Sequence, residues 1–334
     1  MRKLSLLFAI CVLGVAILGV AGAAEKVVTV QIGFENTMQE PIGQALTKWQ
    51  ELVAEKSNGT MKVDIFANSA LGNKKDIIDM MLLGEPVITL ADGAFYADYG
   101  VPDFGIVFGP FLFDDWDQCW ALTESDWYAG QSKALEEKGL KILASNWVYG
   151  ARHTLTTKKV TSPEDLKGLK IRVPANRIQT EGFIALGAAA TGMSLGDVYQ
   201  ALQAGVIDGA ENPLSTLYGR KLHEVAKHLI LDGHVLNFTT WICGTLFFDS
   251  LTEEQQEILI SAAVEAGIYN NQLAENAEKE YLGMMVAEGV IVTEMTPESQ
   301  AAFKEAAQSF YSLGDKFGWS ENLYETVRKA MGAE

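Results

Sequence analysis

Lys167-Gly168-Leu169-Lys170-Ile171-Arg172-Val173-Pro174 is the stretch from which the fold of this chain can be worked out. Its apolar residues alternate with charged ones, and successive side chains of a β-strand point to opposite faces. The alternation predicts a strand with one apolar face that ends at Pro174. Arg172 lies on the opposite, polar face of that strand.

The segments around this strand complete an α/β unit. Ser162-Pro163-Glu164-Asp165 is typical of a helix start, because serine caps a helix, proline suits the first turn and acids favour the positive helix end. After the strand, the pattern predicts helices at about 176–186 and 194–204. A further strand from about 206 leads into Glu211-Asn212-Pro213.

An earlier part of the chain repeats this alternation of strands and helices. The order strand, helix, strand, helix, strand is that of a mostly parallel α/β lobe. A second series of strands then begins near residue 140. The predicted segments are strands at 27–34, 61–65, 87–90, 141–147 and 152–157, and helices at 42–56 and 74–83, the latter with Asn73 as its cap.

Residues 252–287 predict one long helix that opens with a capping box, Thr252-Glu253-Glu254-Gln255. At about 1.5 Å per residue, such a helix is roughly 50 Å long. Because one small lobe does not need that length, we expect the helix to run across two lobes. A strand at 290–295 and helices from about Glu298 and about Glu321 complete the chain.

Composition agrees with two folded lobes. The chain has 334 residues, 48% of them hydrophobic, which excludes disorder, and at this length a single core usually splits. Its 43 Asp plus Glu against 26 Lys plus Arg give a net charge of −17. Nucleic-acid affinity comes mainly from Lys and Arg that neutralise phosphates, so the charge argues against a nucleic-acid partner.

The N-terminus has the pattern of a signal peptide. A basic start, Arg2 and Lys3, precedes an uncharged and largely apolar run at 4–20 and the small residues 21–24. We expect cleavage after Ala23; an uncleaved membrane anchor is the alternative. No later stretch is long and apolar enough to span a bilayer.

Two cysteines, Cys119 and Cys243, remain after this segment. In an exported chain they could form a disulfide, and two buried free thiols fit the sequence equally well. No CxxC pattern occurs, so structural zinc and thioredoxin-like redox chemistry lack support.

Motifs of catalysis are missing as well. The chain contains no GxSxG, GxGxxG or GxxxxGK[ST] pattern. His223 and His228 are five residues apart rather than the four of HExxH, so they diverge around a helix and are interpreted as solvated helix histidines. Asp114, Asp115 and Asp117 are interpreted as a solvated helix start. We therefore expect no metal and no cofactor.

Arg152, in the predicted strand at 152–157, and Arg172 are the best candidates for ligand contacts. Ligands of α/β lobes bind at the carboxyl ends of strands, and Pro174 marks such an end, so Arg172 is expected to point into a crevice. A guanidinium grips a carboxylate with two parallel hydrogen bonds. A surface or interlobe salt bridge is the structural alternative for an arginine at this place.

At this point the chain resembles a known family. The stretch Lys167 to Pro174, Val198-Tyr199-Gln200-Ala201-Leu202-Gln203 and the run Val206 to Pro213 resemble signature blocks of the DctP family. These proteins are the extracytoplasmic solute-binding proteins of TRAP (tripartite ATP-independent periplasmic) transporters. Further positions, at Glu55 to Gly59, Leu71-Gly72 and Gly150-Ala151-Arg152, match in order, so the resemblance covers essentially the whole mature chain.

The resemblance implies an α/β, two-lobed periplasmic solute-binding protein fold with a hinge and a long helix spanning both lobes. Lobe I is then expected to comprise 24–149 plus about 238–277, and lobe II 150–237 plus about 278–334. The lobes close over one organic acid without catalysis.

The resemblance also implies a set of ligand-binding residues. Arg172 grips the substrate carboxylate, Arg152 is a second ligand-contacting arginine and Asn212 hydrogen-bonds the ligand. Three first-lobe residues and one second-lobe residue fall at ligand-facing positions. Apart from the resemblance, three aromatic residues are candidate pocket walls, and core packing fits each of them equally well. These are Glu35, Asn73, Asp92 and Leu195, and Trp147, Tyr149 and Trp241.

Three departures from the family pattern bear on the ligand. Glu35 stands where sialic-acid-binding members have Asn, Asn73 where they have Asp, and Leu195 where many members have Phe. These departures argue against sialic acid. Since Glu35 and Asp92 could accept hydrogen bonds from sugar hydroxyls and would repel a second carboxylate, a sugar acid such as a uronate, aldonate or keto sugar acid is favoured over a C4-dicarboxylate.

The partners implied by the resemblance are the small and large integral membrane subunits of a TRAP transporter, and the location is the periplasm. Two other functions stay open on the sequence alone. One is an exported lyase or hydrolase of sugar acids. The other is a ligand sensor that presents its closed form to a receptor kinase.

Overall fold

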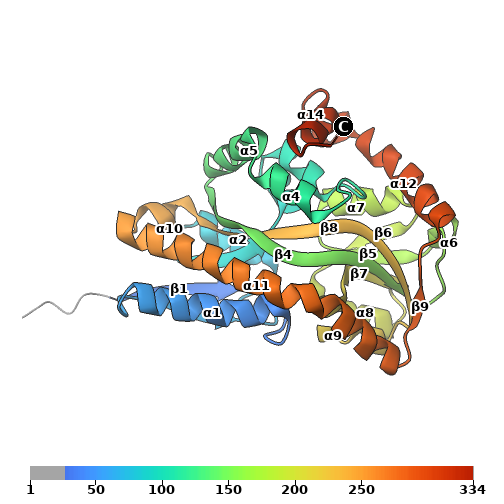
Figure 1. The fold of residues 1–334 in the computed structure, drawn as a ribbon, viewed down its shortest axis with the longest axis horizontal. Helices are drawn as coiled ribbons and strands as arrows, with labels where there is room; N and C mark the ends of the chain where they lie inside the picture. Colours follow the sequence, from blue (N-terminus) through green and yellow to red (C-terminus); the bar gives the residue numbers. More distant parts are fainter. Residues whose placement is uncertain (1–26, 334) are drawn as a thin grey trace, which may run out of the picture.

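The computed structural model describes residues 27–333; the predicted signal peptide, residues 1–23, lies outside them. The chain forms two lobes around one mixed sheet, whose strand order is β2-β1-β3-β8-β4-β7-β5-β6, with β9 paired to β8 (Figure 1). The strands are β1 (Val28–Gly33), β2 (Met61–Phe66), β3 (Val87–Ala91), β4 (Leu140–Thr156), β5 (Lys170–Val173), β6 (Ala189–Gly192), β7 (Gly209–Pro213), β8 (His228–Gly244) and β9 (Ile291–Thr293).

Each lobe has its own parallel strands. In the first lobe β1 pairs in parallel with β2 and β3, and in the second lobe β5 pairs in parallel with β6 and β7. This is the α/β pattern that the alternating segments predict.

Two long antiparallel strands, β4 and β8, join the lobes. The sequence predicts two separate strands at 141–147 and 152–157 and assigns none at 228–244, so both predictions are incomplete. The register of β4 against β8 shifts at several points, including Val148/Gly150, and such bulges bend a strand and increase its twist. Gly150 has φ 134°, and a Cβ there would lie 2.8 Å from Pro213, so this bend requires glycine.

Helices cover the sheet on both sides. The helices and 3-10 turns are α1 (Pro41–Lys56), α2 (Lys74–Leu82), α3 (Gly93–Tyr96), η1 (Pro102–Phe108), α4 (Trp116–Thr123), α5 (Asp126–Glu136), α6 (Pro163–Leu166), α7 (Arg177–Ala185), η2 (Leu195–Asp197), α8 (Val198–Gln203), α9 (Leu214–Gly219), η3 (Leu222–Glu224), α10 (Thr245–Asp249), α11 (Glu253–Ala287), α12 (Pro297–Tyr311), α13 (Gly314–Phe317) and α14 (Leu323–Ala330). Asn73 caps α2 and Thr252 caps α11, as predicted.

The long helix spans the two lobes, as predicted. α11 is 35 residues long and packs on α1 of the first lobe, on β4 and on α9 of the second lobe (Figure 1). At the C-terminus, α12 packs on α6 and α7, but α14 packs on α4 and α5 of the first lobe. The predicted assignment of residues 278–334 to lobe II therefore does not describe α14, and the lobe boundaries stay predictions.

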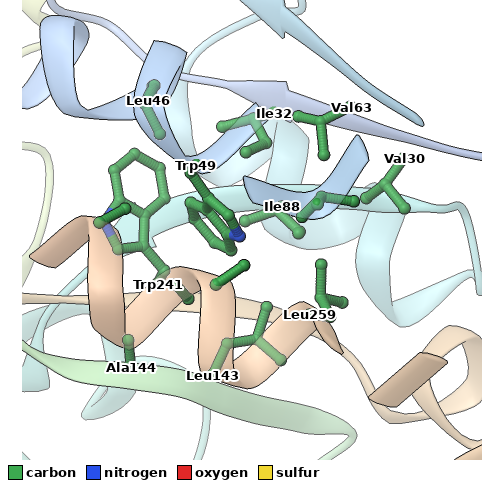
Figure 2. Packing of buried hydrophobic residues seen from close by; sticks show 14 of the residues in the cluster. Val30, Ile32, Leu46, Trp49, Val63, Ile88, Leu143, Ala144, Trp241 and Leu259 are labelled. Atoms are coloured by element: carbon green, nitrogen blue, oxygen red, sulfur yellow. The ribbon is translucent and has the colours of Figure 1, made fainter. Parts of the chain in front are cut away.

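Three tryptophans form the centre of the first lobe's core. Trp49, Trp147 and Trp241 are fully buried, and the ring of Trp241 lies 5.5 Å from that of Trp49 and 5.2 Å from that of Trp147. Figure 2 shows Trp49 and Trp241 between α1, α11 and the sheet, among aliphatic residues such as Leu46, Ile88 and Leu259. Such rings contribute a large share of the apolar area that this lobe buries.

The histidine prediction is wrong. His223 is 2% exposed in η3, where its ring stacks on Tyr218, and His228 begins β8. The two residues lie in different elements, η3 and β8, and neither is a solvated helix residue. Asp115 does cap α4, as the predicted helix start implies, and Cys119 and Cys243 are buried free thiols. No helix within residues 27–333 has the length and apolar character needed to cross a membrane.

Candidate ligand-binding site

A polar pocket lies between the two lobes and, with its opening, holds about 480 Å³. Residues of both lobes and of the two crossing strands line it. The first lobe contributes Glu35, Asn36, Lys74, Thr89, Leu90 and Asp92; β4 and β8 contribute Tyr149, Arg152, Asn237 and Thr239; the second lobe contributes Arg172, Pro174, Gln179, Leu195 and Asn212.

The topology brings these side chains together. Glu35 follows β1 and Asp92 follows β3, while Arg172 lies near the end of β5. The carboxyl ends of parallel strands share one edge of a sheet, where α/β folds bind ligands. Each lobe therefore presents its strand ends to the same space.

Arg172 is a buried cation without an acidic partner. Its side chain is 2% exposed, and both Nε and Nη2 donate to the carbonyl oxygen of Met193, at 2.8 and 2.6 Å. Nη1 is buried and has no hydrogen-bond partner among the described residues. Burial lowers the pKa of Arg172 to about 10, which still leaves it charged at neutral pH. A carboxylate in the pocket would supply the missing acceptor.

Arg152 is equally buried but is paired. Its Nε and Nη2 donate to the two carboxylate oxygens of Glu211 at 2.5 and 2.7 Å, and Nη1 donates to Asn237 at 3.1 Å. Nη2 also donates to the Glu211 carbonyl oxygen at 3.1 Å, so few of the five guanidinium N–H groups remain for a ligand. Burial opposes its charge, but Glu211 outweighs burial and raises the pKa of Arg152.

A chain of buried charges extends from Glu211 away from the pocket. His234 lies 3.1 Å from Glu211 through Nε2 and 3.1 Å from Asp232 through Nδ1. His153 follows, 3.8 Å from Asp232 and 3.3 Å from Glu278 of α11. Burial alone would lower the pKa of His234, but Asp232 and Glu211 raise it to about 9. Sequence reasoning missed this chain, since Glu211, His153 and Glu278 are far in the sequence from the neighbouring pair Asp232 and His234.

Two carboxylates and one ammonium face the arginines. Asp92 caps α3 by accepting a hydrogen bond from the Ala94 amide at 3.0 Å, and burial raises its pKa although Lys74 and Arg152 oppose the rise. Glu35 accepts from the Leu195 amide at 3.2 Å. Sequence reasoning missed Lys74; its only signal was its place directly after the helix cap Asn73.

The remaining predicted residues divide into three groups. Asn212, Leu195 and Tyr149 line the pocket, and the side chain of Asn212 has no hydrogen bond within the part of the chain that the structure describes. Asn73 lines a smaller adjoining hollow, and its side-chain oxygen is used to cap α2. Trp147 and Trp241 do not line the pocket, contrary to the prediction, because both pack in the core beneath it.

The lobes contact each other around the pocket. Besides the bond between Glu35 and Leu195, the Asn36 side chain of the first lobe donates to Thr216 of α9 at 3.1 Å, and Arg220 donates to Asn68 at 3.2 Å. These hydrogen bonds join the two lobes around the pocket. Within residues 27–333, no group of His, Cys, Asp and Glu is arranged to hold a metal ion.

Comparison with known proteins identifies the family. The family model described as bacterial extracellular solute-binding protein, family 7 (DctP), matches residues 32–316. The C4-dicarboxylate-binding periplasmic protein DctP of Rhodobacter capsulatus is 32% identical over 266 residues, which cover 79% of this chain and 80% of that relative.

Solved structures of TRAP periplasmic solute-binding proteins share the fold. One, from Ochrobacterium anthropi with bound L-fuconate, is 36% identical with a TM-score of 0.87, covering 91% of this chain and 99% of its own. Another, from Actinobacillus succinogenes with bound L-galactonate, is 35% identical with a TM-score of 0.86 and the same coverage. The chain thus belongs to family 7 of the bacterial extracellular solute-binding proteins, the DctP family, whose members are substrate-binding components of TRAP transporters and not enzymes.

Proposed function

We propose that this protein captures a sugar acid with a single carboxylate, with Arg172 gripping that carboxylate. The observation that carries the proposal is the Nη1 of Arg172, a buried guanidinium nitrogen with no hydrogen-bond partner within residues 27–333. Taking a charge out of water costs free energy that only a partner offsets, so a buried arginine without an acid favours an anionic ligand. The Asn212 side chain and the remaining N–H group of Arg152 Nη1 supply further donors.

The charges opposite the arginines favour hydroxyls over a second carboxylate. Asp92 is buried, Glu35 faces the same space, and both are acceptors. They would accept hydrogen bonds from sugar hydroxyls, whereas they would repel the second carboxylate of a C4-dicarboxylate. The relatives with bound L-fuconate and L-galactonate support this class of ligand.

A C4-dicarboxylate is the second candidate ligand. The observation that favours it is the 32% identity to the C4-dicarboxylate-binding protein of Rhodobacter capsulatus. The two classes make opposite predictions in a thermal-shift screen against uronates, aldonates, keto sugar acids and C4-dicarboxylates, because a ligand selective for the folded state raises its stability. We expect a sugar acid to give the largest shift and succinate and malate to give none.

Binding then proceeds as a population shift between open and closed forms. The open form takes the acid on one lobe, and closure adds the contacts of the other lobe, such as the bond between Glu35 and the Leu195 amide. The closed form docks on the small and large integral membrane subunits of a TRAP transporter. We place the protein in the periplasm after cleavage near Ala23, which N-terminal sequencing of the exported protein would test.

The residue assignment has a direct test. We expect Arg172→Ala to weaken the binding of the best ligand of the screen at least tenfold in calorimetry, since it removes charge-assisted hydrogen bonds of about 1.5–3 kcal/mol each. Arg328→Ala is the matched control, because Arg328 lies on α14, pairs with Asp114 and does not line the pocket. Near-native affinity in Arg172→Ala would overturn the assignment.

A further inference from the structure

Lys74 is the ligand-facing cation that neither the sequence motifs nor the comparisons single out. It is the first residue of α2, and its ammonium lies 4.5 Å from the centre of the Phe95 ring. Phe95 is buried in α3, the short helix that Asp92 caps. The ring face attracts a cation, so the ammonium is held over the first turn of α3, at the edge of the pocket.

The ammonium of Lys74 has no hydrogen-bond acceptor among the residues that the structure describes. Within residues 27–333 it makes no hydrogen bond and no carboxylate oxygen lies within 4.0 Å of it, whereas the next residue, Lys75, is paired with Asp98 at 3.6 Å. Lys74 lines both the main pocket and the adjoining hollow, and Lys75 lines only the hollow. An ammonium has three N–H donors, and Lys74 therefore brings donors to the lining of the pocket that a ligand would fill.

Asp92 and Glu35 are the acids that attract the Lys74 ammonium, and Arg152 and Arg172 are the cations that repel it. Burial lowers the pKa of Lys74, and the two acids partly offset this lowering. The first lobe therefore presents one donor, Lys74, and two acceptors, Glu35 and Asp92, to the same pocket. A hydroxyl can accept a hydrogen bond from the ammonium and donate one to a carboxylate at the same time.

We propose that Lys74 is a specificity-determining residue that donates a hydrogen bond to a hydroxyl oxygen of the sugar chain, and this inference rests on the proposed binding of sugar acids. A second anionic group is a poorer fit for Lys74, because Glu35 and Asp92 face the same space and would repel it. The lysine thus distinguishes polyhydroxy acids from deoxy acids, while Arg172 recognises the carboxylate that both share.

The test crosses protein variants with ligands that differ by one hydroxyl. The probes are L-galactonate, its singly deoxygenated analogues and the dicarboxylate galactarate. The deoxygenated analogues include L-fuconate, which lacks the terminal hydroxyl. Calorimetry gives the affinity of wild type, Lys74→Met and Lys74→Gln for each probe. Lys75→Met is the matched control, and unfolding of the ligand-free variants checks that each is folded.

We expect Lys74→Met to weaken L-galactonate binding about tenfold or more, since a charge-assisted hydrogen bond is lost. For at least one deoxy analogue the same substitution should cost less than about twofold, because the hydroxyl that Lys74 contacts is already missing. Lys75→Met should leave every affinity within about twofold.

Three results would overturn the inference. An equal loss for every analogue would mean that Lys74 acts only through its charge at a distance. A larger loss for galactarate, which carries a second carboxylate in place of the terminal hydroxymethyl group, would mean that Lys74 binds an anion. If wild type binds no sugar acid at all, the proposed function itself fails, and that result is distinct from the first two.

Discussion

The two buried arginines of the pocket differ in what surrounds them. Arg152, on β4, shares both nitrogens of its fork with Glu211, and Glu211 is tied through His234 to Asp232. In the part of the chain that the structure describes, Arg172, on β5, donates only to a carbonyl oxygen, and its Nη1 has no partner. Both side chains are at most 3% exposed, so the difference is one of partners and not of burial.

This difference assigns separate tasks to two residues that look alike in the sequence. A guanidinium that gives most of its donors to a buried carboxylate and its neighbours chiefly holds structure together. A guanidinium with open donors carries a desolvation cost that a ligand carboxylate relieves. We therefore propose that Arg152 chiefly holds β4, β7 and β8 together and that Arg172 chiefly binds the ligand.

The largest effect that separates the two arginines concerns stability without ligand. Arg152→Met leaves the Glu211 carboxylate buried without its guanidinium, and breaking such a pair costs about 3–5 kcal/mol of unfolding free energy. Arg172→Met removes a cation that has no acid partner, so we expect its unfolding free energy to stay within about 1 kcal/mol of wild type. Denaturant unfolding of the two variants measures both values. Equal losses in the two variants would contradict the comparison.

The Arg152 side of the pocket should also make stability depend on alkaline pH. His234 has a folded-state pKa of about 9, above its unfolded value of about 6.5. The stability from its charge is therefore complete below pH 6.5 and is lost as the pH rises through 9, by at most about 3 kcal/mol. The charge of His153, whose pKa is also raised, acts in the same direction.

Unfolding free energies between pH 6 and pH 10 measure this loss, and His234→Gln is the variant in which it should shrink. Asp232 and Glu211 do not add to it, because their depressed pKa values keep both ionised throughout this range. Stability that rises from pH 7 to pH 9.5 would show that the buried chain is not charged as described.

The smallest effect concerns salt. The chain carries a net charge of −17, so its overall field does not attract an acid, and affinity has to come from short-range contacts in the pocket. Buried pairs are screened little, and we expect the affinity for a sugar acid to fall by less than about threefold between 50 and 500 mM salt. A much steeper fall in calorimetry would point to exposed lysines rather than to Arg172.

Much of the fold follows from local patterns. The alternating strands and helices of the first lobe, the strand that carries Arg172 and the long helix with its capping box all appear where the sequence predicts them. β8 is different, because Asp232, His234 and Asn237 place buried polar groups in it. Their partners, among them Arg152 and Glu211, come from β4 and β7, so no local pattern marks this strand.

The candidate site was predictable to a similar extent. Motif resemblance points to Arg152, Arg172 and Asn212, and all three line the pocket. It does not distinguish the paired arginine from the unpaired one, since that depends on Glu211 and Met193 in space. On the sequence alone, Trp147 and Trp241 fit a pocket wall and a core equally well, and only their packing on Trp49 separates the two.

The structure of the complex with L-galactonate tests the central claim most directly. The account predicts that the ligand carboxylate accepts hydrogen bonds from Nη1 of Arg172 at about 2.7–2.9 Å, while the bonds between Arg152 and Glu211 remain. A carboxylate bound to Arg152 or Lys74, with Arg172 still donating only to Met193, would contradict it.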